Sequence, residues 1–113
     1  MSLPIQALTP ELCVAPQLAP QAMQEAADAG FKSVINNRPD FEGGPDQPTS
    51  ADMAQAAAAA GLVYQHLPVQ GGYQSPEEIE AFRALLDSLP KPILAFCRSG
   101  ARSSRLFAAA SAL

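Results

Sequence analysis

The stretch ILAFCRSGARS, residues 93–103, decides the fold that this sequence predicts. Its first four residues form a short apolar run with the length and residue types of a buried parallel strand. A polar, glycine-containing loop follows, and a helix is expected over residues 102–113. Because a strand that runs through a short loop into a helix is the repeating unit of α/β folds, further units of this kind are expected upstream.

The upstream sequence alternates between strand-like and helix-like segments, with Gly and Pro where each segment should end. We predict that the other strands lie at about 5–8, 12–15, 31–36 and 62–67, and the other helices at about 20–29, 50–60 and 76–89. Prolines around the first two strands suit an antiparallel pair at a sheet edge. Helical connections between the later strands imply right-handed crossovers. The sequence therefore predicts an α/β fold with a mostly parallel four- to five-stranded sheet flanked by helices.

The predicted helix starts contain residues that favour the first turn of a helix. Pro20 suits the first position of its helix, because its ring fixes a helical φ and its missing N–H is not needed there. Thr49 or Ser50 can cap the next helix. Ser75 and Glu78 have the spacing of a capping box, in which each side chain accepts a hydrogen bond from the backbone of the other.

Length and composition indicate one compact domain, which we expect to span residues 1–113: the chain is 48% hydrophobic and 16% charged. The amino-terminal sequence lacks a signal-peptide pattern, and no stretch approaches the roughly 18 apolar residues needed to span a bilayer. Cys13 and Cys97 suggest neither a secreted disulfide framework nor a zinc site. We therefore expect a reduced, cytoplasmic protein without a membrane partner, a metal or a cofactor.

The charge distribution points to a small anion. The formal net charge is -4, so nucleic-acid binding driven by phosphate neutralisation is not expected. All eleven acidic residues lie before residue 88, whereas residues 88–113 carry four basic residues and no acid. Arg98, Arg102 and Arg105 lie within eight positions directly after Cys97. The expected partner is therefore a small oxyanion or a phosphorylated substrate.

The residues from Cys97 to Ser103 are of the kinds that an anion site needs. A loop that leads into a helix points successive backbone N–H groups into one concavity, and the helix N-terminus adds partial positive charge there. Gly100 lets the backbone approach a ligand closely, and Arg102 offers a planar fork for two oxygens of an oxyanion. The same field should lower the pKa of Cys97 and give a nucleophilic thiolate. The alternative is that Cys97 is only a small core residue at a strand end.

Cys97, Arg102 and Asp40 are the predicted catalytic residues, with Asp40 as the candidate general acid. The predicted anion-binding loop comprises Arg98, Ser99, Gly100, Ala101 and Ser103. Arg98 is expected to face solvent and to attract anions through its field. Ser103 either supports the thiolate with its hydroxyl or only begins the helix. Cys13 has no comparable neighbours and is expected to pack within its strand.

A resemblance to a known family rests on four segments: APQL (15–18), VINNRPD (34–40), YQHLPV (64–69) and CRSGARS (97–103). In this order and spacing they resemble the phosphatase-like domain of bacterial beta-lactamase-hydrolase-like proteins. The resemblance implies a small fold like that of protein tyrosine and dual-specificity phosphatases. It also implies that Cys97 is the nucleophile and that Arg102 binds the oxyanion.

The spacing of the cysteine and the arginine departs from that pattern. Phosphatases of the superfamily place five residues between the two, whereas only Arg98, Ser99, Gly100 and Ala101 lie between Cys97 and Arg102. The four-residue spacing is also similar to that of single-domain rhodanese sulfurtransferases, in which the cysteine carries a persulfide. A shorter loop encloses less space, which should favour binding of a terminal sulfur over binding of a tetrahedral phosphoryl group.

The general acid is the second departure. In the superfamily an Asp about thirty residues before the Cys, in the loop after the preceding strand, protonates the leaving alkoxide, but the corresponding segment 68–73 contains no acid. Asp40, in a long Gly- and Pro-rich loop, is the best substitute, with Glu42 behind it; the alternative is that Asp40 only forms a turn. Arg38 either pairs with Asp40 or lines the cleft. His66 either approaches the cysteine loop or is a hydrogen-bonded structural residue.

Three functions remain open from the sequence. The first is a cysteine-dependent phosphatase-like hydrolase that cleaves a phosphate monoester through a thiophosphoryl-cysteine intermediate. The second is a rhodanese-like sulfurtransferase with a persulfide on Cys97. The third is a noncatalytic anion-binding domain.

Overall fold

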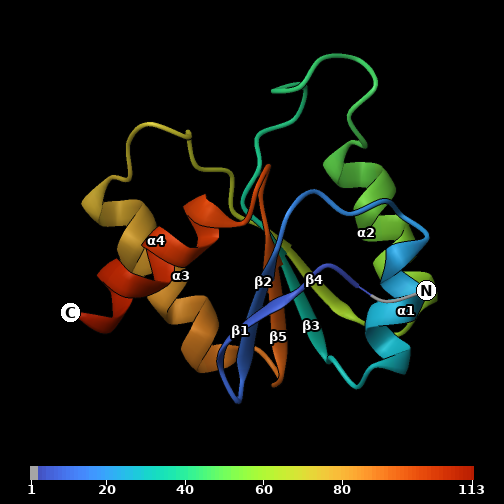
Figure 1. Cartoon of the computed structure of the whole chain (residues 1–113), viewed down its shortest axis with the longest axis horizontal. Helices are drawn as coiled ribbons and strands as arrows, with labels where there is room; N and C mark the ends of the chain where they lie inside the picture. Colours follow the sequence, from blue (N-terminus) through green and yellow to red (C-terminus); the bar gives the residue numbers. More distant parts are fainter. Residues whose placement is uncertain (1–2) are drawn as a thin grey trace.

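The computed structural model describes residues 3–113 and has a five-stranded sheet at its centre (Figure 1). The strand order is β1-β2-β5-β3-β4, with bounds β1 Gln6–Thr9, β2 Leu12–Ala15, β3 Ser33–Asn36, β4 Val63–His66 and β5 Ile93–Phe96. β1 runs antiparallel to β2 at one edge, and the pairings among β2, β5, β3 and β4 are parallel. The predicted mostly parallel sheet is confirmed, as is the antiparallel pair at its edge.

Helices cover both faces of the sheet, as the sequence predicts (Figure 1). α1 (Ala22–Asp28) and α2 (Ser50–Ala59) lie on one face, whereas α3 (Pro76–Ser88) and α4 (Ala101–Ser111) lie on the other. Within residues 3–113, no helix is both long enough and apolar enough to cross a membrane.

The sheet divides the hydrophobic core in two, because successive residues of a strand point to opposite faces. In β3, Val34 packs in the cluster that contains buried residues of α1 and α2, while Ile35 packs in the cluster that contains those of α3 and α4. Leu94 and Ala95 of β5 are divided in the same way. All four residues of β5 are buried. An unbroken apolar run is therefore what this central strand requires.

The helix starts follow the sequence with one exception. The side chain of Thr49 caps α2, and Ser75 and Glu78 form both hydrogen bonds of a capping box at the start of α3. The prediction that Pro20 is the first helical residue is wrong, because Pro20 lies in a turn and α1 begins at Ala22. Proline is as compatible with such a turn as with the first position of a helix, because both use the same φ.

The parallel strands end side by side at one edge of the sheet. Phe96, the last residue of β5, is paired with Ala15 of β2 and with Asn36 of β3, and Asn36 is paired with His66 of β4. The segments that leave these strands therefore meet at the same edge. This is the edge at which parallel α/β sheets place their ligands.

Candidate active site

Cys97 begins the short loop that joins β5 to α4. The residue is 1% exposed, and the Gly100 amide donates a hydrogen bond to its Sγ at 3.1 Å. Gly100 has a φ of 93°, and a Cβ there would lie 3.4 Å from the carbonyl carbon of Ala15 in β2. Both the left-handed backbone and the close approach to β2 favour glycine. The loop thereby turns an amide toward the sulfur.

The surroundings of Cys97 stabilise its thiolate. Burial raises the pKa of the thiol, but hydrogen bonds from the backbone and hydroxyl of Ser103 and from the amides of Gly100 and Ser99 outweigh it, so the pKa lies below its ordinary value. Cys13 lies in β2, where burial raises the pKa of its thiol. The two cysteines therefore differ, and only the pKa of Cys97 is shifted toward ionisation.

Arg102 lies in the first turn of α4 with its guanidinium directed inward. The residue is 6% exposed; its NH1 donates to the carbonyl of Val69 at 3.0 Å, and its NH2 to Oε1 of Glu42 at 3.0 Å. Its Nε has no hydrogen-bond partner, alone in this among the buried side-chain nitrogens and oxygens of residues 3–113. An unpaired buried donor is costly. A bound oxyanion would supply the acceptor that this nitrogen lacks.

Glu42 joins two buried arginines. Its Oε1 lies 2.9 Å from Nε of Arg38 and 3.0 Å from NH2 of Arg102. Burial raises the pKa of Glu42, but the hydrogen bonds and positive charges of Arg102 and Arg38 outweigh it and lower that pKa. Glu42 is therefore an ionised hydrogen-bond acceptor that fixes the orientation of Arg102.

Asp40 is directed to α2 and not to Arg102. The carboxylate is exposed, and its Oδ1 accepts the amide of Ser50 at 2.8 Å. Phe41, between Asp40 and Glu42, has a φ of 64°, so the chain turns sharply between the two acids. Of the two alternatives for Arg38, pairing with Asp40 is not the one observed, because Arg38 pairs with Glu42.

Asn37 is a further residue of the site, which the sequence analysis did not assign. Its Oδ1 accepts the hydroxyl of Ser103 at 2.9 Å, and its Nδ2 donates to the carbonyl of Leu67 at 3.0 Å. Asn37 and Ser103 are both 0% exposed. Because the Ser103 hydroxyl has one proton, it bonds either Asn37 or the thiolate at any moment. The available signal was a polar residue directly after a strand that ends beside β5.

The remaining predicted residues lie on the outside of the loop or beside it. Arg98, Ser99 and Ala101 are exposed. Nε2 of His66 is hydrogen-bonded to the carbonyl of Arg38 at 2.9 Å, so this ring is engaged with the backbone. Exposure of Arg98 is compatible with attraction of anions through its field.

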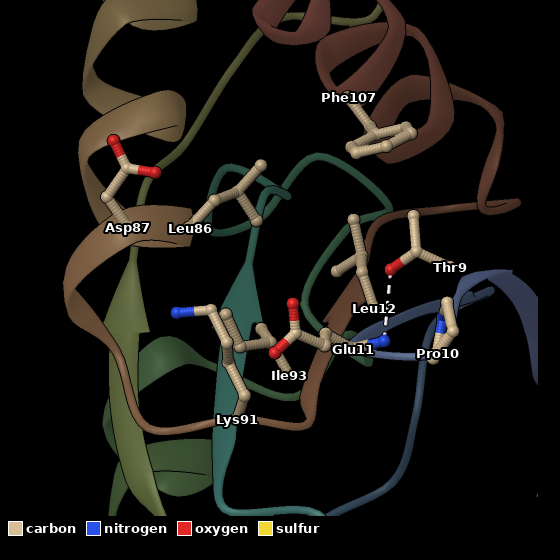
Figure 2. A pocket seen from close by; sticks show the side chains of 9 residues that line it. All are labelled: Thr9, Pro10, Glu11, Leu12, Leu86, Asp87, Lys91, Ile93 and Phe107. Atoms are coloured by element: carbon tan, nitrogen blue, oxygen red, sulfur yellow. Dashed lines mark hydrogen bonds between the residues drawn. The ribbon is translucent and has the colours of Figure 1, made fainter.

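The hollows outside the cysteine loop include one beside α3 and one beside the start of α4. The first, of about 470 Å³, lies between α3, α4 and the β1–β2 hairpin (Figure 2). It is lined by Leu12 and Ile93, the first residues of β2 and β5, so it opens at the sheet edge opposite Cys97. The second, of about 540 Å³, includes Gly71, Tyr73 and Arg105 in its lining and lies beside α4. Residues 3–113 contain no cluster of His, Cys, Asp and Glu that could hold a metal ion.

Sequence comparisons relate almost the whole chain to one family. The family described as "Beta-lactamase hydrolase-like protein, phosphatase-like domain" matches residues 4–113. The beta-lactamase hydrolase-like protein of Agrobacterium fabrum is 39% identical over 84 residues, which cover 74% of this chain and 19% of that protein. Its counterpart in Xylella fastidiosa Temecula1 is 38% identical over 82 residues, or 73% of this chain and 19% of that protein. The chain thus spans less than a quarter of the length of these relatives.

Solved structures agree with the sequence comparisons. A "putative phosphatase" from Neisseria meningitidis Z2491 has a TM-score of 0.86 and 34% identity, over 94% of this chain and 75% of that chain. The active form of Tk-PTP has a TM-score of 0.68 and 19% identity, over 98% of this chain and 82% of that chain, a likeness of fold alone. The predicted protein tyrosine phosphatase-like fold is confirmed. On these matches, the chain belongs to the family of phosphatase-like domains of beta-lactamase hydrolase-like proteins.

Proposed function

We propose that the chain is a cysteine-dependent phosphatase that cleaves phosphate monoesters. The observation that carries this proposal is the unpaired, buried Nε of Arg102 at the start of the helix that follows Cys97. The backbone hydrogen bonds at Cys97 support it, because the same cradle of amides can hold a phosphoryl group. Phosphatase-like relatives and neighbours make a phosphorylated substrate the natural occupant.

Cys97, Arg102 and the backbone amides of the loop each have a role in the proposed reaction. The Cys97 thiolate attacks phosphorus, an S–P bond forms, and the P–O bond to the leaving group breaks with its electron pair on oxygen. Arg102 and the amides of the loop hold the phosphoryl oxygens as charge develops on them. Water then attacks phosphorus in the thiophosphoryl-cysteine, and the S–P electron pair returns to the sulfur. The reaction needs a reduced Cys97, which fits a reducing cytoplasmic compartment.

The test compares two single-cysteine variants with nitrophenyl phosphate as substrate. Cys97→Ser should abolish phosphate release, whereas Cys13→Ser, the matched control, should retain it. Rapid acid quench and peptide mass spectrometry of the wild type should place a phosphoryl group on Cys97. Phosphate release that survives in Cys97→Ser would rule out the proposed nucleophile.

Sulfur transfer is a second candidate, favoured by the four-residue spacing between Cys97 and Arg102. In this reaction the thiolate attacks the outer sulfur of thiosulfate, the S–S bond breaks, and sulfite leaves with the bonding electron pair. A thiol acceptor then removes the sulfur from Cys97. Incubation with thiosulfate alone should add one sulfur atom to Cys97 if this reaction occurs. Anion binding without either reaction would instead indicate a noncatalytic domain.

A further inference from the structure

The loop between β4 and α3, residues 67–75, already lies against the catalytic arginine. The carbonyl of Val69 accepts NH1 of Arg102 at 3.0 Å, and Nε2 of Gln74 donates to the Arg102 carbonyl at 3.2 Å. A Cβ on Gly71 would lie 3.1 Å from NH2 of the same arginine. The carbonyl of Gly71 also accepts NH2 of Arg105 at 3.1 Å. The loop is thus held against the start of α4.

This loop contains no carboxylic acid. Residues 67–75 read LPVQGGYQS, without Asp or Glu. A proton donor for the leaving group must lie within hydrogen-bond reach of the departing oxygen. The only phenol in this loop is that of Tyr73, whose side chain is exposed. The loop that contacts Arg102 therefore lacks the strong proton donor that alkoxide departure needs.

The acids of loop 37–48 nearest the arginine are engaged otherwise. Glu42 accepts hydrogen bonds from both Arg38 and Arg102 through the same oxygen, so it is held as an ionised acceptor. Asp40 accepts the amide of Ser50 at the start of α2. His66 is hydrogen-bonded to the backbone of Arg38. In each of these three groups, one polar atom is held by a contact within the protein, and the two arginines hold Glu42 in its ionised form.

We propose that this site acts on phosphoryl compounds whose leaving group departs as a stable anion without a proton, such as electron-poor aryl phosphates and acyl phosphates. The inference rests on the proposed phosphatase function and names its substrate class. When Cys97 forms the S–P bond, the P–O bond breaks and both electrons remain on a phenolate or carboxylate oxygen. Water later releases phosphate from Cys97, and its protons pass to phosphate and solvent. Alkyl phosphates, whose alkoxides need protonation, are poor substrates.

The test is a leaving-group series of dinitrophenyl, nitrophenyl, phenyl and ethyl phosphate. The quantity compared is kcat/KM, because it reports the steps up to formation of the thiophosphoryl-cysteine and not its later hydrolysis. We expect kcat/KM to fall by about 10²-fold or more from dinitrophenyl to phenyl phosphate, since a positioned proton donor contributes an effect of that order when present. Acetyl phosphate should be hydrolysed in a Cys97-dependent manner, and ethyl phosphate should not be hydrolysed measurably. Values of kcat/KM within tenfold of one another across the aryl esters would overturn the inference.

Two variants test whether Glu42 or Tyr73 acts as the proton donor. In Glu42→Gln and in Tyr73→Phe, the ratio of kcat/KM between dinitrophenyl and phenyl phosphate should equal that of the wild type. A selective loss of activity on phenyl phosphate in either variant would identify that residue as the acid and contradict the inference. A ratio within one protein is insensitive to how much of the protein is folded.

Failure of the inference and failure of the proposed function give different results. Equal rates on all aryl esters, lost in Cys97→Ser, would leave the phosphatase standing and overturn only the substrate class. Absence of Cys97-dependent release from every ester and from acetyl phosphate would overturn both.

Discussion

Glu42 and Arg102, 60 residues apart in the sequence, form an ion pair with an N–O distance of 3.0 Å. The pair ties the loop after β3 to the first turn of α4. Because Oε1 of Glu42 also accepts Arg38, one carboxylate oxygen sets the position of two guanidinium groups at the edge of the proposed site.

Replacement of Glu42 should reduce the change in the free energy of unfolding as pH falls into the acidic range. Because its pKa is lowered in the folded protein, Glu42 contributes stability above its ordinary pKa, and this contribution is lost as pH falls through the lowered value. Glu42→Gln should therefore be less stable by about 0.5–1 kcal/mol at neutral pH, since solvent screens this partly exposed carboxylate, and the difference should shrink on acidification. Urea unfolding at a series of pH values measures it, with Asp46→Asn, an exposed acid of the same loop, as the control. A difference that stays constant with pH would contradict an ionic role.

Arg102→Lys should retain the charge and lose most of the activity. Lysine cannot present a planar fork, so the bonds to Val69, Glu42 and a phosphoryl oxygen cannot all be kept. We expect kcat/KM for nitrophenyl phosphate to fall by about 10²–10³-fold, the effect of losing one preorganised oxyanion donor. Arg83→Lys, a change at an exposed arginine of α3, is the matched control and should stay within a few-fold of the wild type. Comparable losses in both variants would mean that general positive charge, and not the fork, matters.

Gly100→Ala should destabilise the loop, whereas Gly72→Ala should not. Gly100 combines a φ of 93° with close approach to Ala15, while a Cβ on Gly72 would have nothing within 4 Å. We expect Gly100→Ala to lower the free energy of unfolding by about 1–2 kcal/mol and to reduce turnover of nitrophenyl phosphate. Thermal unfolding and initial rates of both variants measure the difference. Equal behaviour of the two variants would show that the left-handed backbone at Gly100 is not required.

Ser103→Ala should raise the pKa of Cys97. Hydrogen bonds from Ser103 are among those that lower this pKa, so loss of the hydroxyl moves thiolate formation to higher pH. The ultraviolet absorbance of the thiolate, measured in a Cys13→Ser background, reports Cys97 alone. Ser104→Ala is the control, because that hydroxyl donates to the carbonyl of Gly100 at 3.0 Å. If the pKa of Cys97 is the same in Ser103→Ala as in its parent, the hydroxyl serves only Asn37.

The parts of the fold that depend on short-range patterns could be predicted from the sequence. The apolar run of β5 and the bounds of β2 match the structure because prolines and the polar loop define where each strand stops. The capping box at Ser75 also depends only on neighbouring residues. The position of Cys97 and Arg102 at the carboxyl edge follows from strand order, which helical crossovers largely determine.

The residues that support the site depend on tertiary contacts and were harder to predict. The sequence favours Asp40 over Glu42 as the acid beside Arg102. Phe41, between them, has a left-handed backbone that is unusual for a non-glycine residue, and this turn is not visible in the sequence. Asn37 reaches Ser103 across 66 positions, and no local pattern indicates such a pair. The catalytic roles of Cys97, Arg102 and the loop residues stay predictions until the variants above are measured.

The end of β2 is joined to the cysteine loop by backbone hydrogen bonds. The amide of Cys97 donates to the carbonyl of Ala15 at 3.3 Å, and the amide of Gln17 donates to the carbonyl of Arg98 at 3.2 Å. Cys97, the proposed nucleophile, therefore rests on the β1–β2 hairpin. Deleting that hairpin would remove the support of the cysteine loop while leaving every residue of that loop in the sequence, so the hairpin and the loop have to be expressed and engineered as one unit.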